Sequence, residues 1–266
     1  MCLSFVAFAT IRVLNFRQNT FNITIQSNLK SKAMNAIITG ASRGMGKAVA
    51  EIFGLHGYNL FLCSQNESRL LETVSELETK FPNITINAQA FDLGKKQQAQ
   101  LFGEWILNNA DTIDILVNNV GTFIPGNISN EPDGALEKML EVNLYSAYFV
   151  TRALLPKMIA QKSGHIFNMG SIAGLQAYPN GGAYSISKFA VIGFSRNLRY
   201  ELMPHNIKVT TIIPGAVYTD SWSGSGVAED RIMKASDIAD LIYTASRLSI
   251  AATVEEIIVR PQLGDL

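Results

Sequence analysis

A tyrosine and a lysine stand four residues apart, as Tyr184 and Lys188, at the start of a segment with helical periodicity. Side chains at this spacing lie on one face of a helix, so both can act on the same ligand. A phenol with an ordinary pKa of about 10 exchanges protons poorly at neutral pH, but an adjacent ammonium favours the phenolate and lowers that pKa. The pair therefore predicts a general acid and base for a carbonyl and its alcohol. Because such pairs also arise by chance, their position in the fold has to support this interpretation.

Ser171 follows an apolar run at 164–169 and can donate a hydrogen bond to a substrate oxygen on which negative charge develops. A nucleophilic serine would need a histidine with an acidic partner. The three histidines, His56, His165 and His205, stand instead near the entrances of expected helices or strands. The pattern therefore disfavours a serine protease or esterase.

Asn143 lies in the otherwise apolar stretch Val142-Asn-Leu-Tyr145 of a long expected helix. A buried amide needs hydrogen-bond partners, so this residue has either a functional or a structural task. The structural alternative is an amide that kinks the helix.

A glycine-rich turn follows the first expected strand and opens the first expected helix. Glycine allows the backbone to turn sharply and to approach a pyrophosphate, and the helix N-terminus offers free N–H groups and a partial positive charge. The spacing of these glycines differs from the usual dinucleotide fingerprint, and a purely structural turn is the alternative. The candidate phosphate-binding residues are Gly40, Ser42, Arg43, Gly44, Met45 and Gly46.

The end of the second expected strand bears on the choice between NADP(H) and NAD(H). An acid there would bind the adenosine ribose 2′-hydroxyl and repel a 2′-phosphate, but the stretch 63–66 has no acid before Glu67. Arg43 supplies a cation, although it is also interpretable as a solvated residue at the helix start. With Gln65 as a further contact, we expect a preference for NADP(H), with NAD(H) possible.

Asp92 and Leu93 follow the third expected strand. Asp92 is placed to meet the adenine edge, and its alternative role is to cap the helix that follows.

The elements that must position these residues alternate in type. Short runs rich in Ile, Val and Phe alternate with segments of helical period, which is typical of β-α-β units and a parallel sheet. The expected strands are 35–39, 58–63, 84–91, 113–118, 164–169, 207–213 and 256–260. The expected helices are 44–56, 67–80, 96–110, 133–160, 183–203 and 236–248. This predicts an α/β fold: a single Rossmann-type domain with a doubly wound, seven-stranded parallel sheet and helices on both faces. The candidate residues then meet at the carboxyl ends of the strands.

The fold-like pattern begins at Met34, whereas residues 1–33 show no helical or strand period long enough to trust. We expect Met34 to be the natural start and residues 1–33 to be a disordered, functionally silent extension. A short targeting or docking arm is the alternative.

Composition narrows the function. Lys plus Arg and Asp plus Glu number 22 each, so no long-range field attracts nucleic acid or anionic lipid. No apolar stretch reaches the roughly 18 residues needed to span a bilayer. The two cysteines, Cys2 and Cys63, have no spacing typical of a disulfide framework or a zinc site. We therefore expect a cytoplasmic protein with no metal, no nucleic-acid partner and no membrane.

From Asn35 to the C-terminus the chain resembles the short-chain dehydrogenase/reductase family. The resemblance rests on six elements in order: Thr-Gly-x-x-x-Gly-x-Gly at 39–46, Asn118-Asn-Val-Gly121, Asn143, Ser171, Tyr184-x-x-x-Lys188, and Pro214-Gly215 with Thr219. Val120 stands where the family usually has Ala, and Gln65 where NADP-preferring members often have Arg.

The resemblance implies roles for these residues. Lys188 would hold the nicotinamide ribose, and Asn143 would hold a water that links Lys188 to solvent. The remaining cofactor contacts implied are Asn119, Val120, Gly121, Pro214, Gly215, Val217 and Thr219. The implied catalytic residues are Asn143, Ser171, Tyr184 and Lys188.

The expected function is hydride transfer between NADP(H) and a small carbonyl or secondary alcohol, similar to 3-oxoacyl-thioester reductases or pterin reductases. The stretch 216–234 reads as a short lid, which favours a compact substrate. Candidates for the substrate wall are Gly170, Ala173, Gln176, Tyr178, Tyr218 and Trp222, and packing is the alternative role of the aromatic residues among them. The resemblance also implies a homodimer or homotetramer through the helices 133–160 and 183–203, whose apolar residues include Tyr148, Phe149, Phe189 and Phe194. A face buried against the sheet is the alternative for part of this pattern. The alternative function is a non-catalytic NADP(H) sensor.

Overall fold

A computed structural model describes residues 9–12, 22–25, 33–177, 179–219, 222 and 226–266. The chain divides into two units, Met1–Lys32 and Ala33–Leu266. In the first unit, strands β1 (Ala9–Arg12) and β2 (Asn22–Ile25) pair antiparallel, a pairing that the sequence pattern did not indicate. The predicted disorder and silence of residues 1–33 fall mostly on residues outside those described, and they stay predictions.

The second unit is built on a seven-stranded sheet in which every pair of neighbours is parallel. The strand order is β11-β8-β7-β6-β3-β4-β5. The strands are β3 (Asn35–Thr39), β4 (Asn59–Ser64), β5 (Ile86–Ala90), β6 (Ile115–Asn118), β7 (His165–Met169), β8 (Lys208–Pro214) and β11 (Glu256–Val259). The predicted doubly wound parallel sheet is confirmed, and each predicted strand boundary lies within two residues of the observed one.

Alternate residues of the central strands supply two separate hydrophobic layers. Ile37, Phe61 and Leu116 face one layer, whereas Ile38 and Leu62 face the other. Both faces of these strands are buried, which is why they read as continuous apolar runs rather than as an alternation of apolar and polar residues.

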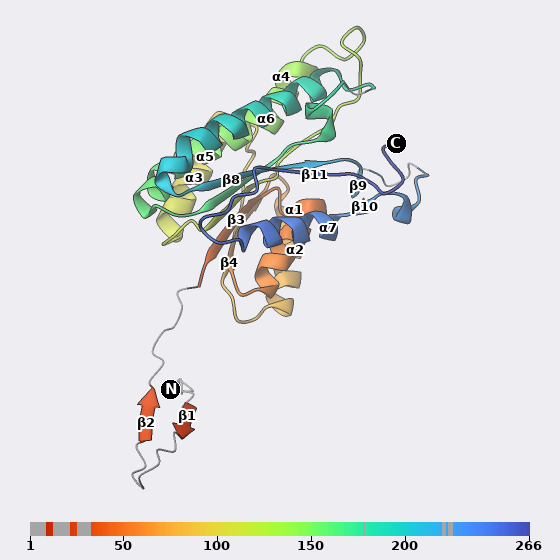
Figure 1. Cartoon of the computed structure of the whole chain (residues 1–266). Coiled ribbons are helices and arrows are strands. Elements are labelled where there is room, and N and C mark those ends of the chain that lie inside the picture. The colour runs from red at the N-terminus through yellow and green to blue at the C-terminus, as the bar shows by residue number, and fades with distance from the viewer. Residues whose placement is uncertain (1–8, 13–21, 26–32, 178, 220–221, 223–225) are drawn as a thin grey trace. The chain divides into compact units, whose positions relative to one another are not determined.

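Helices cover both faces of this sheet (Figure 1). One layer contains α1 (Gly44–Leu55), α2 (Glu67–Lys80) and α7 (Ala235–Ser246), whose apolar residues share a core cluster. The other contains α3 (Lys96–Asn109), α5 (Ser146–Gln161) and α6 (Gly182–Leu202), which share a second cluster. The predicted helices on both faces are therefore confirmed.

The helix expected over 133–160 is not uniform. It consists of α4 (Ala135–Met139), a π-helical turn (Leu140–Tyr145) and α5. The π-turn contains Asn143, whose amide side chain bonds outside the helix, and such turns occur often at functional sites.

Short elements follow the main strands. The stretch 216–234, expected to be irregular, contains β9 (Val217–Tyr218), a 3-10 turn (Glu229–Arg231) and β10 (Met233–Lys234). β9 and β10 pair in parallel, so the two ends of the expected lid are fastened together. Further 3-10 turns lie at Ile172–Gly174 after β7 and at Met203–His205 after α6.

Candidate active site

The carboxyl ends of β3 and β6 form the point from which the sheet runs in opposite directions, because β3 pairs with β4 on one side and with β6 on the other. Ligands of doubly wound sheets bind beyond the strands at such a point. The loops after these two strands hold the glycine-rich turn and the stretch from Asn119 to Gly121.

The glycine-rich turn is shaped by close backbone contacts. Gly40 has φ +66°, a left-handed conformation that favours glycine. A Cβ on Gly46 would overlap the carbonyl oxygen of Gly40, so the first turn of α1 packs directly on the loop. Arg43 is the N-cap of α1 and makes no side-chain cap, and the first turn holds no acid. The N-terminus of α1 can therefore offer its backbone N–H groups and partial positive charge to a phosphate.

Asn119 fastens the loop after β6 to the glycine-rich turn. Its side-chain amide donates to the carbonyl oxygens of Thr39 and Gly40, at 3.0 and 3.1 Å. The backbone N–H groups of Asn119 and Val120 donate in turn to the Thr39 hydroxyl, at 3.0 and 3.3 Å. These bonds hold the two loops as one surface.

β4 ends in the hydroxyl of Ser64, where an acid would select NAD(H). The side-chain oxygens of Ser42 and Ser64 lie 2.8 Å apart, and Thr73 on α2 donates to the carbonyl of Ser42 at 3.0 Å. Arg43 and Gln65, which follow these two serines in the chain, are exposed. This part of the chain thus offers hydroxyls and a guanidinium, and β4 ends without a carboxylate.

The contacts of Asp92, Leu93 and Met45 indicate which of their groups remain for a cofactor. Asp92 accepts from the N–H of Gly94 at 3.3 Å, whereas the N-cap of α3 is Lys95, so Asp92 shapes the preceding turn and does not cap the helix. The Leu93 side chain is buried in the core, as is most of the Met45 side chain, which leaves their backbone groups for a ligand.

Tyr184 and Lys188 lie together on the first turns of α6. The Lys188 ammonium is 5.8 Å from the centroid of the Tyr184 ring and donates to the carbonyl of Met169, at the end of β7, at 2.8 Å. Lys188 is 5% exposed, and this burial lowers the pKa of its amine to about 8. At pH 7 the amine remains mostly protonated, so a cation lies beside the phenol.

Asn143 ties this helix to the loop after β6. Its side-chain oxygen accepts from the N–H of Thr122 at 2.7 Å, and its side-chain nitrogen donates to the Thr122 carbonyl and to the Ser187 hydroxyl, at 3.0 and 2.9 Å. A Cβ on Gly121 would lie 3.4 Å from the Asn143 oxygen and 3.7 Å from the Lys188 ammonium. Three elements distant in sequence therefore converge at Gly121.

Ser171 lies two residues beyond Met169 and is almost fully buried. Its hydroxyl accepts from the N–H of Ala173 at 3.2 Å and so caps the 3-10 turn. A Cβ on Gly174 would lie 2.7 Å from the Lys188 carbonyl, so this turn packs directly on α6. Ser171 is thus held at the same end of the sheet as the tyrosine and the lysine.

The segment after β8 meets the glycine-rich turn. Pro214 ends β8, and Gly215 donates through its N–H to Val259 at 2.8 Å. The Val217 side chain is buried in the core. A Cβ on Gly44 would lie 3.2 Å from a methyl carbon of Thr219, so this segment lies against the start of α1.

The residues predicted for the substrate wall differ in exposure, and the prediction missed one aromatic residue beside Tyr184. Gly170 and Ala173 are buried, Gln176 is exposed, and Tyr218 and Trp222 are half-buried, whereas Tyr178 lies outside the described residues. The missed residue is Phe123, which is 48% exposed and whose ring lies edge to face with the Tyr184 ring, with centroids 4.8 Å apart. An apolar residue two positions after Gly121 was the available signal.

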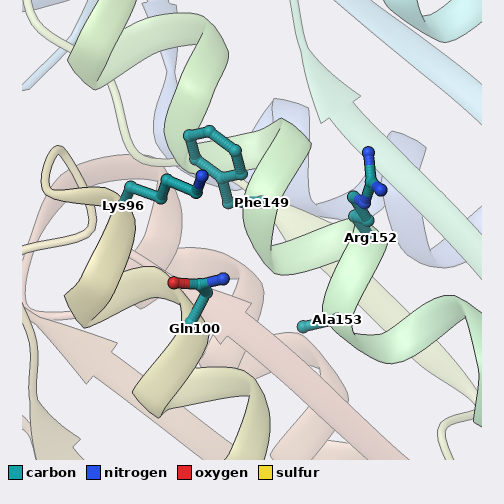
Figure 2. Close-up of a pocket in the computed structure, with 5 residues that line it drawn as sticks. All are labelled: Lys96, Gln100, Phe149, Arg152 and Ala153. Atoms are coloured by element: carbon teal, nitrogen blue, oxygen red, sulfur yellow. The ribbon is translucent and has the colours of Figure 1, made fainter.

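A cavity of about 370 Å³ lies elsewhere, between α3 and α5. Figure 2 shows its lining residues, with Lys96 directed toward the Phe149 ring. It contains none of the predicted catalytic or cofactor residues and adds nothing to the site described above.

Aromatic residues predicted on the surfaces of α5 and α6 form a cluster. The Tyr148 ring contacts the rings of Phe149 and Phe194, with centroids 5.4 and 5.7 Å apart. Tyr148 and Phe189 are exposed, whereas Phe149 and Phe194 are half-buried. Among the described residues, no helix is long and apolar enough to cross a membrane, and no group of three or more His, Cys, Asp or Glu side chains could hold a metal ion.

Comparisons with known proteins show a family model and relatives that match most of this chain. The family model for short chain dehydrogenases matches residues 34–229. An uncharacterized oxidoreductase of Staphylococcus epidermidis is 31% identical over 232 residues, which cover 87% of this chain and 99% of the relative. The mouse protein named dehydrogenase/reductase SDR family member 7B is 36% identical over 202 residues, which cover 72% of this chain and 61% of that protein.

Two solved structures share the fold. An alcohol dehydrogenase from the archaeon Thermococcus sibiricus, complexed with 5-hydroxy-NADP, has a TM-score of 0.81 at 26% identity and covers 88% of this chain and 99% of its own. The closed form of a serine dehydrogenase, complexed with NADP+, has a TM-score of 0.78 at 27% identity and covers 88% of this chain and 97% of its own.

Proposed function

The chain belongs to the short-chain dehydrogenase/reductase family of oxidoreductases, and we propose that it transfers a hydride between NADP(H) and a small carbonyl or secondary alcohol, with Tyr184 as the general acid and base. The observation that carries this proposal is the buried Lys188 ammonium, 5.8 Å from the centre of the Tyr184 ring. A cation in this place favours the phenolate that remains when the phenol gives its proton to a substrate oxygen.

Each catalytic residue has a separate task in this proposal. Tyr184 gives its proton to the carbonyl oxygen during reduction and takes it back during oxidation. Ser171 donates a hydrogen bond to the same oxygen as charge develops on it. Lys188 stabilises the phenolate, and Asn143 holds the loop at Thr122 against the catalytic helix. The nicotinamide, when bound, supplies or accepts the hydride.

The residues of the glycine-rich turn fit a dinucleotide. Gly40 is left-handed, Gly46 leaves no space for a side chain beside it, and the N-terminus of α1 has no acid to oppose a phosphate. The exposed Arg43, next to Ser42 in the chain, supports a preference for NADP(H), as does β4, which ends without a carboxylate that would repel a 2′-phosphate. The archaeal alcohol dehydrogenase and the serine dehydrogenase were both solved with NADP-type cofactors, which agrees with this choice.

The side chains proposed to contact the substrate near the Tyr184 phenol are aromatic. Phe123 presents an exposed ring beside Tyr184, and Tyr218 and Trp222 follow on the segment after β8. The parallel pairing of β9 with β10 holds the two ends of the expected lid together. A compact carbonyl compound with an apolar group next to the carbonyl suits this wall.

The decisive experiment compares the wild type with Tyr184→Phe. A panel of small aldehydes, ketones, 3-oxoacyl thioesters and pterins is screened by the loss of NADPH absorbance, and NADPH binding is measured by fluorescence. We expect turnover by the wild type only and similar NADPH affinity in both proteins. Equal activity in the variant would remove the mechanism. NADPH binding without turnover of any compound would favour the alternative of a non-catalytic sensor.

We also propose an oligomeric state, a cellular location and a functionally silent N-terminal segment. The aromatic cluster of Tyr148, Phe149 and Phe194 supports a homodimer or homotetramer through α5 and α6, which light scattering of the purified protein measures. We place the protein in the cytoplasm. A chain that begins at Met34 should keep full activity if residues 1–33 are functionally silent.

A further inference from the structure

The catalytic helix α6 has no cap of its own. Its N-cap residue is Gly181, which has no side chain, and the helix starts at Gly182 with φ +25°. The first backbone N–H groups of a helix need acceptors from outside the helix. Here the N–H of Ala183 donates to a carboxylate oxygen of Glu131 at 2.9 Å, across 52 residues of sequence.

Two glycines, Gly126 and Gly182, leave the space that the Glu131 side chain occupies. A Cβ on Gly182 would collide with the Glu131 carboxylate, and a Cβ on Gly126 would lie 2.8 Å from the Glu131 Cβ. Beside it, the N–H of Gly126 donates to the carbonyl of Asn180 at 2.9 Å. Glu131 is therefore half-buried, with its carboxylate between its own loop and the start of α6.

The residue that Glu131 holds is the neighbour of the catalytic phenol. Ala183 is fully buried and packs with Met139, and Tyr184 follows it directly. The same loop touches the phenol itself, because the Phe123 ring lies against the Tyr184 ring. A carboxylate at a helix N-terminus also complements the partial positive charge there.

We propose that Glu131 is a positioning residue for Tyr184: its carboxylate caps the catalytic helix and so fixes the phenol relative to the substrate and Lys188. This inference rests on the proposed function. It assigns to Glu131 no contact with substrate or cofactor; the residue acts through the backbone of Ala183. Loss of the cap lets the first turn of α6 fray, and a displacement of about 1 Å at a reacting group can lower a rate by about 100-fold.

Three substitutions of Glu131 test the effects of its hydrogen-bond acceptor, its side-chain length and its charge separately. Glu131→Ala removes the acceptor, Glu131→Asp keeps the charge but is too short by one methylene, and Glu131→Gln keeps an acceptor oxygen at full length. The control is Glu137→Ala, which removes an exposed acid of the neighbouring helix α4. For each variant, kcat and KM for a substrate of the wild type and the NADPH dissociation constant are measured, together with amide hydrogen exchange over residues 182–188.

We expect kcat to fall by about 10- to 100-fold in the Ala and Asp variants, with KM and the NADPH dissociation constant within about threefold of the wild type. Glu131→Gln should restore kcat to within about threefold, and Glu137→Ala should match the wild type. Amide exchange over residues 182–188 should accelerate in the Ala and Asp variants only. If Glu131→Ala does not fold, Glu131→Asp and Glu131→Gln carry the comparison.

The proposal is overturned if folded Glu131→Asp keeps the kcat of the wild type, or if Glu131→Gln is as slow as Glu131→Asp. Tyr184→Phe is measured beside them. If Tyr184→Phe turns over as fast as the wild type, the proposed function fails. If Tyr184→Phe is inactive and Glu131→Asp is fully active, only the role of Glu131 fails.

Discussion

Replacing Lys188 with methionine removes the cation beside the phenol with little change in volume. At the 5.8 Å between the ammonium and the ring centroid, and with an effective dielectric constant of about 20, the attraction between an ammonium and a phenolate is about 3 kcal/mol. A fully formed phenolate in the transition state would then lose about 100-fold in rate, and a half-transferred proton would lose about 10-fold. We therefore expect kcat of Lys188→Met to fall by about 10- to 100-fold.

A matched control is available on α5. Lys157 also donates from its ammonium to a backbone carbonyl, that of Ala110, but lies away from the proposed site. Lys157→Met loses the same kind of hydrogen bond and should keep kcat. Both variants are measured for NADPH oxidation at saturating cofactor, with thermal unfolding as a check on the fold. If Lys188→Met keeps kcat within about threefold of the wild type, the ammonium does not activate the phenol.

The pH dependence gives a second measurement of the same pair. Burial lowers the pKa of the Lys188 amine from 10.5 to about 8, so the cation is present below pH 8 and is lost as the pH rises through that value. Reduction needs both the cation and a protonated phenol. We expect kcat for carbonyl reduction by the wild type to be level below pH 8 and to fall above it, and Lys188→Met to lack this fall. The same transition in both proteins would assign it to another group.

Three further predictions use other parts of the chain. Arg43→Ala should weaken binding of NADPH more than of NADH, measured by fluorescence; equal weakening would argue against a 2′-phosphate contact. Gly46→Ala should abolish NADPH binding, because its Cβ would overlap the Gly40 carbonyl, whereas Gly193→Ala, which meets open space, should bind normally. Burial lowers the pKa of His165 from 6.5 to about 3, so below pH 6.5 the unfolded chain binds a proton that the native chain does not. The free energy of unfolding should then fall by about 2 kcal/mol between about pH 6.5 and about pH 4.5, at most about 1.4 kcal/mol for each pH unit, and a slope as steep in His165→Gln would assign the loss to other groups.

The sequence was informative where a residue's surroundings depend on its near neighbours in the chain. Strand and helix boundaries followed from hydrophobic periodicity, because burial on one or both faces of an element imposes a period that can be read locally. The glycine-rich turn was recognisable for a similar reason, since a left-handed Gly40 and a Gly46 without space for a side chain are requirements of one short loop. The spacing of Tyr184 and Lys188 was enough to place both side chains on one helical face.

Other features depend on contacts between distant parts of the chain. The π-turn at Asn143 accompanies hydrogen bonds of its amide to Thr122 and to Ser187, 21 and 44 residues away. No local period indicates such a turn, and the segment was expected to be one regular helix. The alternative role of Asp92, a cap of the following helix, is wrong, because the chain makes a turn after Asp92 and the N-cap of α3 is Lys95, three residues later.

The sequence by itself determined the α/β class and the parallel sheet, because these follow from periodicity. It also predicted which residues carry acid–base chemistry, because that prediction needs only their type and spacing. Tertiary structure alone decided that Phe123 lies against the phenol and that Glu131 caps the helix that carries it. It also decided that burial lowers the pKa of the Lys188 amine. The physical reason is that packing, long-range hydrogen bonds and desolvation arise between segments that only the folded chain brings together.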